Sequence, residues 1–478
     1  MTDEAGSARD WTETVDDPGR RRLLAAALAT TLTGLAGCSS DDIGSIDTDT
    51  EADDSSNADF DPFDYEGREA DAQWRDAARD RIEEHRKASL EVTVTDAAGD
   101  PVSDATVDVS MQEHAFNWGT AANGEKVADD ETSDGERYRQ VLAEKFNYST
   151  VENRLRAFKW RESAENRSEA RQMVEWLNNH GHDVRGHALF WESYDWMDVD
   201  PDQSAKAVDE AVRERIEARA AAFDGQLAAW DCQNHPFHRT AIREDIGRDS
   251  VFGWWRTAQE TDTQASMGIN EMNVLTRYDG AAGWEDDLVE WVKWLRENGV
   301  AVDAIGCQSH SPVTNLTGIP DVLSRLDKLA DEFDLPVYVS EFHVPLWTDV
   351  EWADADEAKH AAQADYVRDF LTAAFSHPVV ETVVVWNFWA GWAWRPSSCF
   401  YGRDWTLRRH GQEYVRLVFD EWWTETRGET GAEGHFETSG FLGEYEVSAS
   451  NEGRSTSVET TLSADGATVE IILDRSDQ

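Results

Sequence analysis

Acidic, imidazole and indole side chains recur directly after short β-rich runs along this 478-residue sequence. Carboxylates and imidazoles at such positions can attack a substrate or move protons, and indole faces stack on sugar rings while excluding water. The pattern predicts a site centred on Glu341 that holds a sugar polymer. In chain order the residues are Glu152, Asn153, Arg185, His187, Trp191, Asn234, His235, Gln308, His310, Glu341, His343, Trp386, Trp389, Trp392 and Trp394.

Tryptophan is unusually frequent, with 22 copies, and four of them fall within Trp386–Trp394. Such a run cannot be buried completely in one element, so some of these indoles should form a platform for a saccharide. The alternative is that they fill the end of a barrel, which would account for roughly a third of them.

Eight β-rich runs alternate with amphipathic helical stretches and would position these side chains. Over about 310 residues they predict an α/β fold, a (β/α)8 TIM barrel at residues 113–425, whose reactive groups lie at the C-terminal ends of the strands. A doubly wound open sheet is the alternative, but no Gly-rich phosphate loop follows a strand. The runs are the Trp118 segment, Phe146–Val151, Asp183–Ala188, Leu227–Asp231, Ser266–Asn270, Ala304–Gln308, Pro336–Ser340 and Val383–Trp386, with helices at Ala205–Ala222, Leu288–Glu297 and Ala358–Phe375.

The N-terminal segment has the plan of an export signal. Three arginines precede an apolar run, Leu23–Leu35, that is too short for a permanent membrane span and ends in Leu-Ala-Gly-Cys. Residues 1–38 resemble a twin-arginine signal with a lipoprotein box, which makes Cys38 the expected lipidation site. Residues 39–73, rich in Asp, Ser and Thr, are predicted to be a disordered tether. We therefore expect a protein that is lipid-anchored on the extracellular face of the membrane, or secreted.

Two shorter segments flank the predicted barrel. Residues 74–112 read as a helix followed by a β-hairpin, with Leu90–Thr95 and Ala105–Ser110 joined by turn chemistry at Ala97–Pro101. Residues 426–478 alternate with period two and predict a small β-rich C-terminal appendage.

The charge balance restricts the partners. Asp and Glu number 96 against 44 Lys and Arg, which gives a net charge of −52. This charge repels nucleic acid and anionic membranes, so any membrane contact should run through the lipid alone. Acidic residues along the whole chain, with few lysines, suit a halophilic protein. We expect no cofactor, because no metal-ligand spacing such as CxxC is present, and Cys232, Cys307 and Cys399 form no disulfide framework.

Seven motifs in order resemble glycoside hydrolase family 10, the endo-1,4-β-xylanase family, over roughly residues 88–425. They are Val151–Asn153, Val184–Trp191, Trp230–Asn234, Ile269–Glu271, Ile305–His310, Ser340–Phe342 and Trp386–Arg395. The resemblance implies a retaining hydrolase of xylan or a related β-1,4-glycan, with Glu341 as the nucleophile. It also implies that Gln308 and His310 orient Glu341 and that Asn234 bonds a sugar 2-hydroxyl. By the same resemblance, sugar is bound by Glu152, Asn153, His187, Trp191, Trp386 and Trp394.

The sequence departs from the family at the acid/base position, where the family has Glu and this chain has His235. An imidazolium can donate a proton near neutral pH, and we expect the carboxylate of Glu341 to raise the pKa of His235 and keep it charged. The alternative is a catalytically degenerate protein that binds polysaccharide. His343 replaces a family Asp and Arg156 a family Lys, and Glu192 follows Trp191 where the family usually has His.

The extra histidines raise one more possibility. Two histidines and a carboxylate can bind a divalent metal, and His235 and His343 are both expected near Glu341. Histidine beside a carboxylate more often forms a hydrogen-bonded pair, so no metal site is expected.

Overall fold

The structure, a computed structural model, describes residues 63–473 except 279, 281–282 and 347–354. The predicted signal with Cys38 and most of the predicted tether lie outside the described residues and stay predictions. Among the residues that are described, none of the helices is both long enough and apolar enough to cross a membrane.

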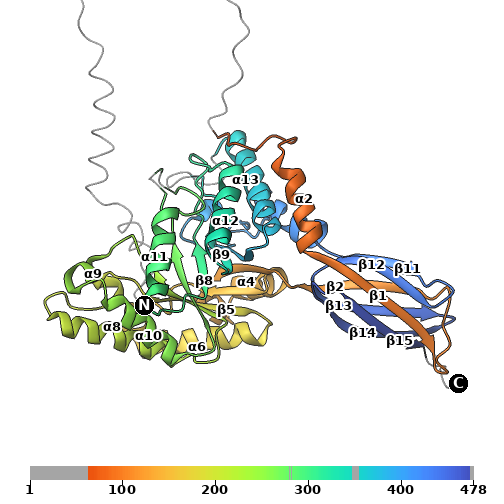
Figure 1. The fold of residues 1–478 in the computed structure, drawn as a ribbon, viewed down its shortest axis with the longest axis horizontal. Helices are drawn as coiled ribbons and strands as arrows, with labels where there is room; N and C mark the ends of the chain where they lie inside the picture. The colour runs from red at the N-terminus through yellow and green to blue at the C-terminus, as the bar shows by residue number, and fades with distance from the viewer. Residues whose placement is uncertain (1–62, 279, 281–282, 347–354, 474–478) are drawn as a thin grey trace, which may run out of the picture. The chain divides into compact units, whose positions relative to one another are not determined.

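Eight parallel strands close a barrel in the order β10-β3-β4-β5-β6-β7-β8-β9, which confirms the predicted (β/α)8 fold (Figure 1). Each of the eight β-rich runs forms one strand, because buried β-branched and small residues repeat in every run. The strands are β3 (Asn117–Ala122), β4 (Tyr148–Val151), β5 (Asp183–Phe190), β6 (Ala229–Asn234), β7 (Ser266–Glu271), β8 (Ala304–Cys307), β9 (Val337–Phe342) and β10 (Val380–Val385).

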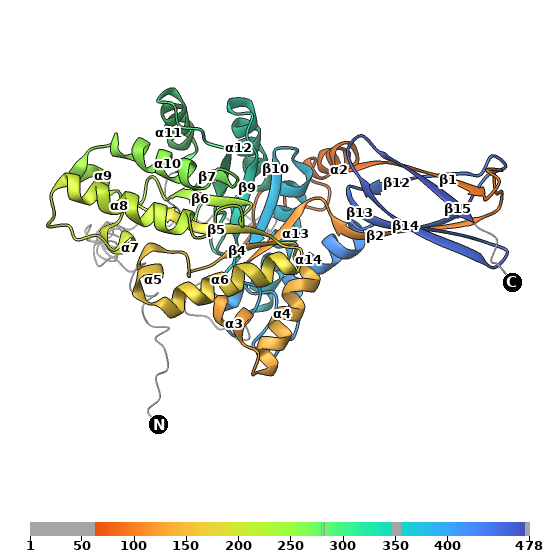
Figure 2. The same cartoon turned by 90° about the horizontal axis from the view of Figure 1, so that it is seen from below.

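Helices surround this barrel (Figure 2), and many of their apolar residues are buried in the same core as those of the strands. The three predicted barrel helices correspond to α8, α11 and α13, and the predicted N-terminal helix corresponds to α2. The α-helices are α2 (Trp74–His85), α3 (Gly124–Ala128), α4 (Ser133–Lys145), α5 (Ala157–Glu162), α6 (Ala164–Asn179), α7 (Tyr194–Met197), α8 (Ala205–Ala220), α9 (Ala241–Ile246), α10 (Ser250–Thr261), α11 (Glu285–Glu297), α12 (Ile319–Glu332), α13 (Glu357–Ser376) and α14 (Arg409–Arg416); η2 (Pro396–Ser398) is a 3-10 helix and η3 (Leu417–Glu421) a π-helix.

A buried arginine on α8 fixes the backbone at the C-terminal end of β5. Arg219 is fully buried and donates hydrogen bonds to the carbonyl oxygens of Leu155, Ala188 and Leu189. Burial lowers its pKa to about 9, so the guanidinium is charged at neutral pH. Each hydrogen bond from a charged donor contributes about 1.5–3 kcal/mol. Arg219 therefore holds the segment from which His187 and the residues after β5 project.

The C-terminal segment is β-rich as predicted, but in the N-terminal segment β1 (Lys87–Asp96) and β2 (Thr106–His114) lie in different sheets. The predicted β-hairpin is therefore wrong. Strand β1 pairs with β12 and β15 in a three-stranded sheet, and β2 pairs with β11 and β13 in a four-stranded sheet with β14. The C-terminal strands are β11 (Glu425–Glu429), β12 (His435–Phe441), β13 (Gly443–Asn451), β14 (Arg454–Leu462) and β15 (Ala467–Leu473).

The two sheets form a sandwich, with their apolar faces packed together. Leu90, Val92 and Val94 from β1 and Val107 and Val109 from β2 are buried in the same core. The chain does reverse after β1, where Val102 N donates to Val94 O. Period-two alternation is the same for strands that pair edge to edge and for strands that face each other across a core. The sequence pattern alone could not separate these two arrangements.

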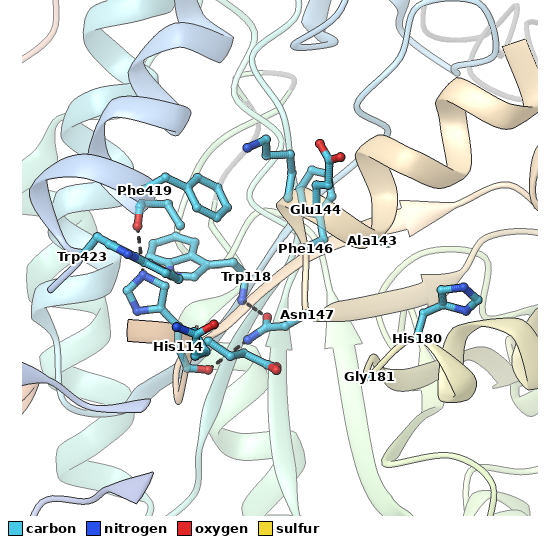
Figure 3. A pocket seen from close by; sticks show the side chains of 14 residues that line it. His114, Trp118, Ala143, Glu144, Phe146, Asn147, His180, Gly181, Phe419 and Trp423 are labelled. Atoms are coloured by element: carbon cyan, nitrogen blue, oxygen red, sulfur yellow. Dashed lines mark hydrogen bonds between the residues drawn. The ribbon is translucent and has the colours of Figure 1, made fainter. Parts of the chain in front are cut away.

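A cavity of about 120 Å³ lies at the opposite end of the barrel from Glu341 (Figure 3). Its lining includes Trp118, at the start of β3, and Asn147, just before β4. The Asn147 side chain accepts from Trp118 N and donates to the carbonyl oxygen of His114. These are contacts at the N-terminal ends of barrel strands, a face that supports stability rather than chemistry.

Candidate active site

Glu341 lies near the end of β9 and is 5% exposed. Asn270 Nδ2 donates to its Oε1 at 2.9 Å, and His310 Nε2 lies 3.5 Å from its Oε2. Burial by itself raises the pKa of Glu341, but the hydrogen bond from His310 and the charges of His187 and His310 outweigh it. The net pKa is below the usual range, so Glu341 is ionised at neutral pH and its carboxylate can act as a nucleophile.

His343 orients the ring of His310 through a contact between their Nδ1 atoms. The two Nδ1 atoms are 2.9 Å apart, and the two residues also form a backbone bridge. Burial lowers the pKa of His343 well below its usual value, so its ring is neutral. Because one of the two facing nitrogens carries the hydrogen, this pair sets the tautomer of His310. Within the described ranges no group of three or more His, Cys, Asp or Glu side chains could hold a metal ion, and these two imidazoles bond to each other.

A buried ion-pair network joins the neighbouring strands. His187 Nδ1 lies 2.7 Å from Asp231 Oδ2, and Arg185 Nε lies 3.6 Å from the same oxygen. Arg185 also donates to the carbonyl oxygen of Ser340 at 2.9 Å, beside Glu341 on β9. Arg156 Nη2 is 3.5 Å from His187 Nε2. The imidazole of His187 is therefore held in one orientation at the mouth of the barrel.

Asn270, at the end of β7, connects two predicted site residues. Its Nδ2 donates to Asn234 Oδ1 at 3.0 Å as well as to Glu341, and its own Oδ1 accepts from Ser340 Oγ at 2.6 Å. We did not single out Asn270 as a site residue from the sequence. The available signal was its place at a strand end within the motif Ile269–Glu271.

Glu152 and Asn153 follow β4 and contribute polar atoms to the same end of the barrel. Burial raises the pKa of Glu152, an effect that the charge of Arg156 partly offsets. Among the described residues neither Glu152 Oε2 nor Asn153 Oδ1 has a hydrogen-bond partner, although both atoms are buried. Buried acceptors in this state suit the hydroxyl donors of a sugar.

The tryptophans after β10 divide between the site and the core. The Trp386 ring is 5.5 Å from that of His187, and the Trp394 ring is 5.4 Å from that of His310. Trp389 is buried and stacks on Trp405 with ring centres 4.6 Å apart. Strand β10, which precedes the run, pairs with β9 on one side and with β3 on the other. Trp386 is buried as well, and Trp394 is partly buried against its cluster, so much of the run packs in the core; its use as a sugar platform stays a prediction.

His235 is the first residue after β6, and its neighbours come from three other strand ends. Its Nδ1 lies 3.1 Å from Glu271 Oε1, and its Nε2 lies 3.0 Å from Gln308 Nε2. Its ring centre lies 4.4 Å from that of Trp191, and its main-chain N–H donates to the carbonyl oxygen of Asn270. The predicted site residues Trp191, Gln308 and His235 thus lie together, and His235 contacts the buried carboxyl of Glu271.

The expectation that Glu341 keeps His235 charged is wrong. Burial lowers the pKa of His235 to about 3, and the nearby Glu341 offsets only part of this effect. Burial destabilises the charged form of the ring more than the attraction of one carboxylate stabilises it. His235 is therefore a neutral imidazole at neutral pH, and it cannot act there as a stored imidazolium.

Glu271 is an unexpected acid in the site. Its side chain is fully buried, and the backbone N–H groups of Phe237 and Met272 donate to its oxygens at 2.9 and 2.7 Å. Burial raises its pKa to about 8, more than these hydrogen bonds lower it. At neutral pH the carboxyl of Glu271 therefore carries a proton. It ends β7 directly after Asn270, and the sequence marked it only as part of a motif.

Comparisons with known proteins indicate the family of this chain. The sequence model of glycosyl hydrolase family 10 matches residues 108–420. The chain is 30% identical over 397 residues to the anti-sigma-I factor RsgI6 of Acetivibrio thermocellus, covering 80% of this chain and 47% of that protein. It is 25% identical over 352 residues to endo-1,4-beta-xylanase 2 of Arabidopsis thaliana, covering 72% of this chain and 31% of that protein. The chain thus spans less than half the length of these two curated relatives.

Solved structures share the barrel. Native xylanase 10B from Thermotoga maritima superposes with a TM-score of 0.56 at 20% sequence identity, covering 64% of this chain and 96% of that one. Native xylanase 10C from Cellvibrio japonicus gives a TM-score of 0.55 at 18% identity, over 64% of this chain and 71% of that one. At 18–20% identity this likeness is evidence for the fold alone.

Proposed function

Because the chain belongs to glycosyl hydrolase family 10, we propose that it is a retaining, endo-acting hydrolase of xylan or a related β-1,4-linked glycan. In this proposal Glu341 attacks the anomeric carbon, and His235 occupies the position that protonates the leaving oxygen. The observation that carries it is the ionised, buried carboxylate of Glu341, held by Asn270 and His310. Xylanases among the relatives supply the substrate class.

Sugar binding would use the groups around Glu341. Glu152 and Asn153 offer buried acceptors to sugar hydroxyls, and Trp386 and Trp394 offer indole faces beside His187 and His310. Asn234 would bond the 2-hydroxyl, a contact that strengthens as positive charge develops on the ring.

The protein is expected to release reducing sugar from xylan in concentrated salt, where its acidic surface is screened. Proton NMR at early times should show the β-anomer as the first product, because a double displacement retains configuration. Assays from low salt to several molar NaCl would also test the proposed halophilic character, which predicts higher activity as salt rises. Activity that is highest without salt would contradict that character.

A second candidate function is polysaccharide binding without turnover. The observations that favour it are the neutral, buried imidazole in the acid/base position and a relative named as an anti-sigma factor rather than an enzyme. Protein that binds xylan in a pull-down at high salt, yet releases no reducing sugar, would replace the first proposal with this one.

We also propose that residues 1–38 direct export and that Cys38 carries a lipid anchor. Replacing Cys38 by alanine should then move the protein from the membrane fraction to the medium, because a lipid chain supplies the membrane affinity. Cell fractionation and immunoblotting measure the distribution, with Cys399→Ala as the matched cysteine control. A Cys38→Ala protein that stays with the membrane would contradict the anchor.

A further inference from the structure

We propose that Glu271 is the proton reservoir of the site and that His235 relays its proton to and from the substrate. The inference rests on the proposed hydrolase function and extends it to a residue that does not touch the sugar. Glu271 is thus a positioning residue that acts through His235. The pair would replace the single carboxylic acid that a retaining glycosidase uses.

The two ring nitrogens of His235 have different partners. Nδ1 faces Glu271 Oε1 at 3.1 Å, while Nε2 faces Gln308 Nε2 at 3.0 Å. Because an amide nitrogen only donates, this orientation of Gln308 fits the tautomer with its hydrogen on Nδ1, and the tautomer with its hydrogen on Nε2 needs the Gln308 amide turned by half a turn. The side chain of His235 is 12% exposed and that of Glu271 is 0% exposed. Glu271 therefore has no direct route to water, and the proton-accepting nitrogen beside it is Nδ1 of His235.

The second oxygen of Glu271 is held so that the first can exchange a proton. Oε2 accepts from Phe237 N, and Oε1 accepts from Met272 N while it faces the ring. These backbone donors stabilise the carboxylate that remains after the proton leaves. The carboxyl can therefore alternate between its two protonation states without moving.

Burial explains why a relay is needed. The pKa of His235, lowered to about 3, leaves no imidazolium at neutral pH. A neutral ring can give up its Nε2 hydrogen readily only if Nδ1 gains one in the same step. Glu271, with its pKa raised to about 8 by burial, holds that hydrogen at neutral pH.

The first chemical step forms the glycosyl-enzyme. Glu341 forms a bond to the anomeric carbon, and the glycosidic C–O bond breaks with its electron pair going to the leaving oxygen. That oxygen takes the hydrogen from His235 Nε2, while the hydroxyl of Glu271 passes its hydrogen to Nδ1. Glu271 ends as a carboxylate, and His235 remains neutral with its hydrogen on Nδ1.

The second step reverses each transfer. Water forms a bond to the anomeric carbon and gives one hydrogen to His235 Nε2 as the bond to Glu341 breaks. The hydrogen on Nδ1 returns to Glu271. Gln308 can pair with both tautomers, because a half-turn of its amide exchanges a donor nitrogen for an acceptor oxygen.

Several titratable and charged groups surround the pair and would shape its pH dependence. Around His235 these are Glu341, His187, His310, Arg156 and His238, and around Glu271 they are Arg243, Glu341 and the thiol of Cys307. The acidic form of Glu271 is lost as pH rises through about 8. Turnover that needs the relay should therefore fall above that pH.

Glu271→Gln is expected to lower kcat/KM on unactivated xylo-oligosaccharides by about 10²–10⁴-fold, the range of general acid catalysis. The variant should still give a full burst of dinitrophenolate, one per active site, from 2,4-dinitrophenyl β-xylobioside, whose leaving group needs no proton. The alkaline limb near pH 8 should disappear as well. Glu192→Gln is the matched control: Glu192 is equally buried but is held by Gln233 and Arg243, and its loss should leave the ratio between the two substrates unchanged.

Two outcomes would overturn the relay. One is a Glu271→Gln enzyme with the wild-type ratio and pH profile, and the other is equal loss on both substrates. The proposed hydrolase fails separately, if the wild-type protein gives no burst and no sugar. Nitrogen-15 NMR of the His235 ring in the intact protein needs no activity: a neutral ring that changes tautomer near pH 8 is expected, and an imidazolium at pH 6–7 would also overturn the relay.

Discussion

Replacing Glu341 by glutamine is expected to lower the turnover of xylan by at least about 10³-fold, because the amide cannot form the glycosyl-enzyme. The variant should fold, since its amide oxygen can still accept from Asn270 Nδ2 and its shape is unchanged. Binding of xylo-oligosaccharides, measured by calorimetry, should remain. Reducing-sugar assays and burst kinetics with the dinitrophenyl substrate check the loss, and both should be affected.

A sharper form of this experiment adds an external nucleophile. Glu341→Ala leaves space beside Asn270, and azide supplied in solution should restore the release of dinitrophenolate by bonding to the anomeric carbon, with the α-glycosyl azide as the other product. The glycoside product identifies the replaced group, because a single displacement inverts the anomeric carbon. Glu341→Gln with unchanged turnover, or azide rescue that yields the β-product, would remove Glu341 from the chemistry.

Replacing His235 by alanine is expected to reduce kcat/KM on unactivated xylan by about 10²–10⁴-fold and to leave the aryl-glycoside burst intact. The imidazole lies between Glu271 and Gln308, so in the proposed relay its removal breaks the proton path. His235→Glu places a carboxyl where the family has one and should turn over xylan at least as fast as the wild type. Initial rates on both substrates give the comparison.

This series also separates the two candidate functions. If the chain is a binding protein with a degenerate site, wild type and His235→Ala will be equally inactive on xylan, and only His235→Glu will gain activity. If His235→Glu is no faster than His235→Ala, the remaining groups around Glu341 are not competent.

The barrel and the place of its site were predictable from the sequence because the information is local. Each predicted run, such as Ala304–Gln308 or Pro336–Ser340, is short, rich in apolar residues and followed by polar residues, so its strand end could be located without a partner. Glu341, His310 and Gln308 were singled out on this basis, and the structure brings them to one end of the barrel. Whether they perform the assigned roles stays a prediction for the experiments above.

The features that sequence reasoning missed depend on neighbours distant in the chain. The charge state of His235 is set by burial among residues from other strand ends, including Trp191 and Glu271, and no local pattern encodes it. The partners of β1 lie more than 340 residues away, at Phe436–Phe441 and Ala467–Leu473, and alternation cannot choose between partners. Likewise Trp389 and Trp394 look alike in sequence, and only tertiary packing separates them.

The sandwich has a kinetic consequence for how this chain is made. Its first strand, β1, pairs with β15 up to Leu473, so the sandwich cannot form completely until residue 473 has been synthesised. Meanwhile all eight barrel strands and most of their helices are available, with contacts much closer along the chain. Loop-closure entropy slows pairings of such long range, and unpaired strand edges promote association during the wait. Assembly of the sandwich therefore depends on the β1–β15 pairing, which needs the last residues of the fold.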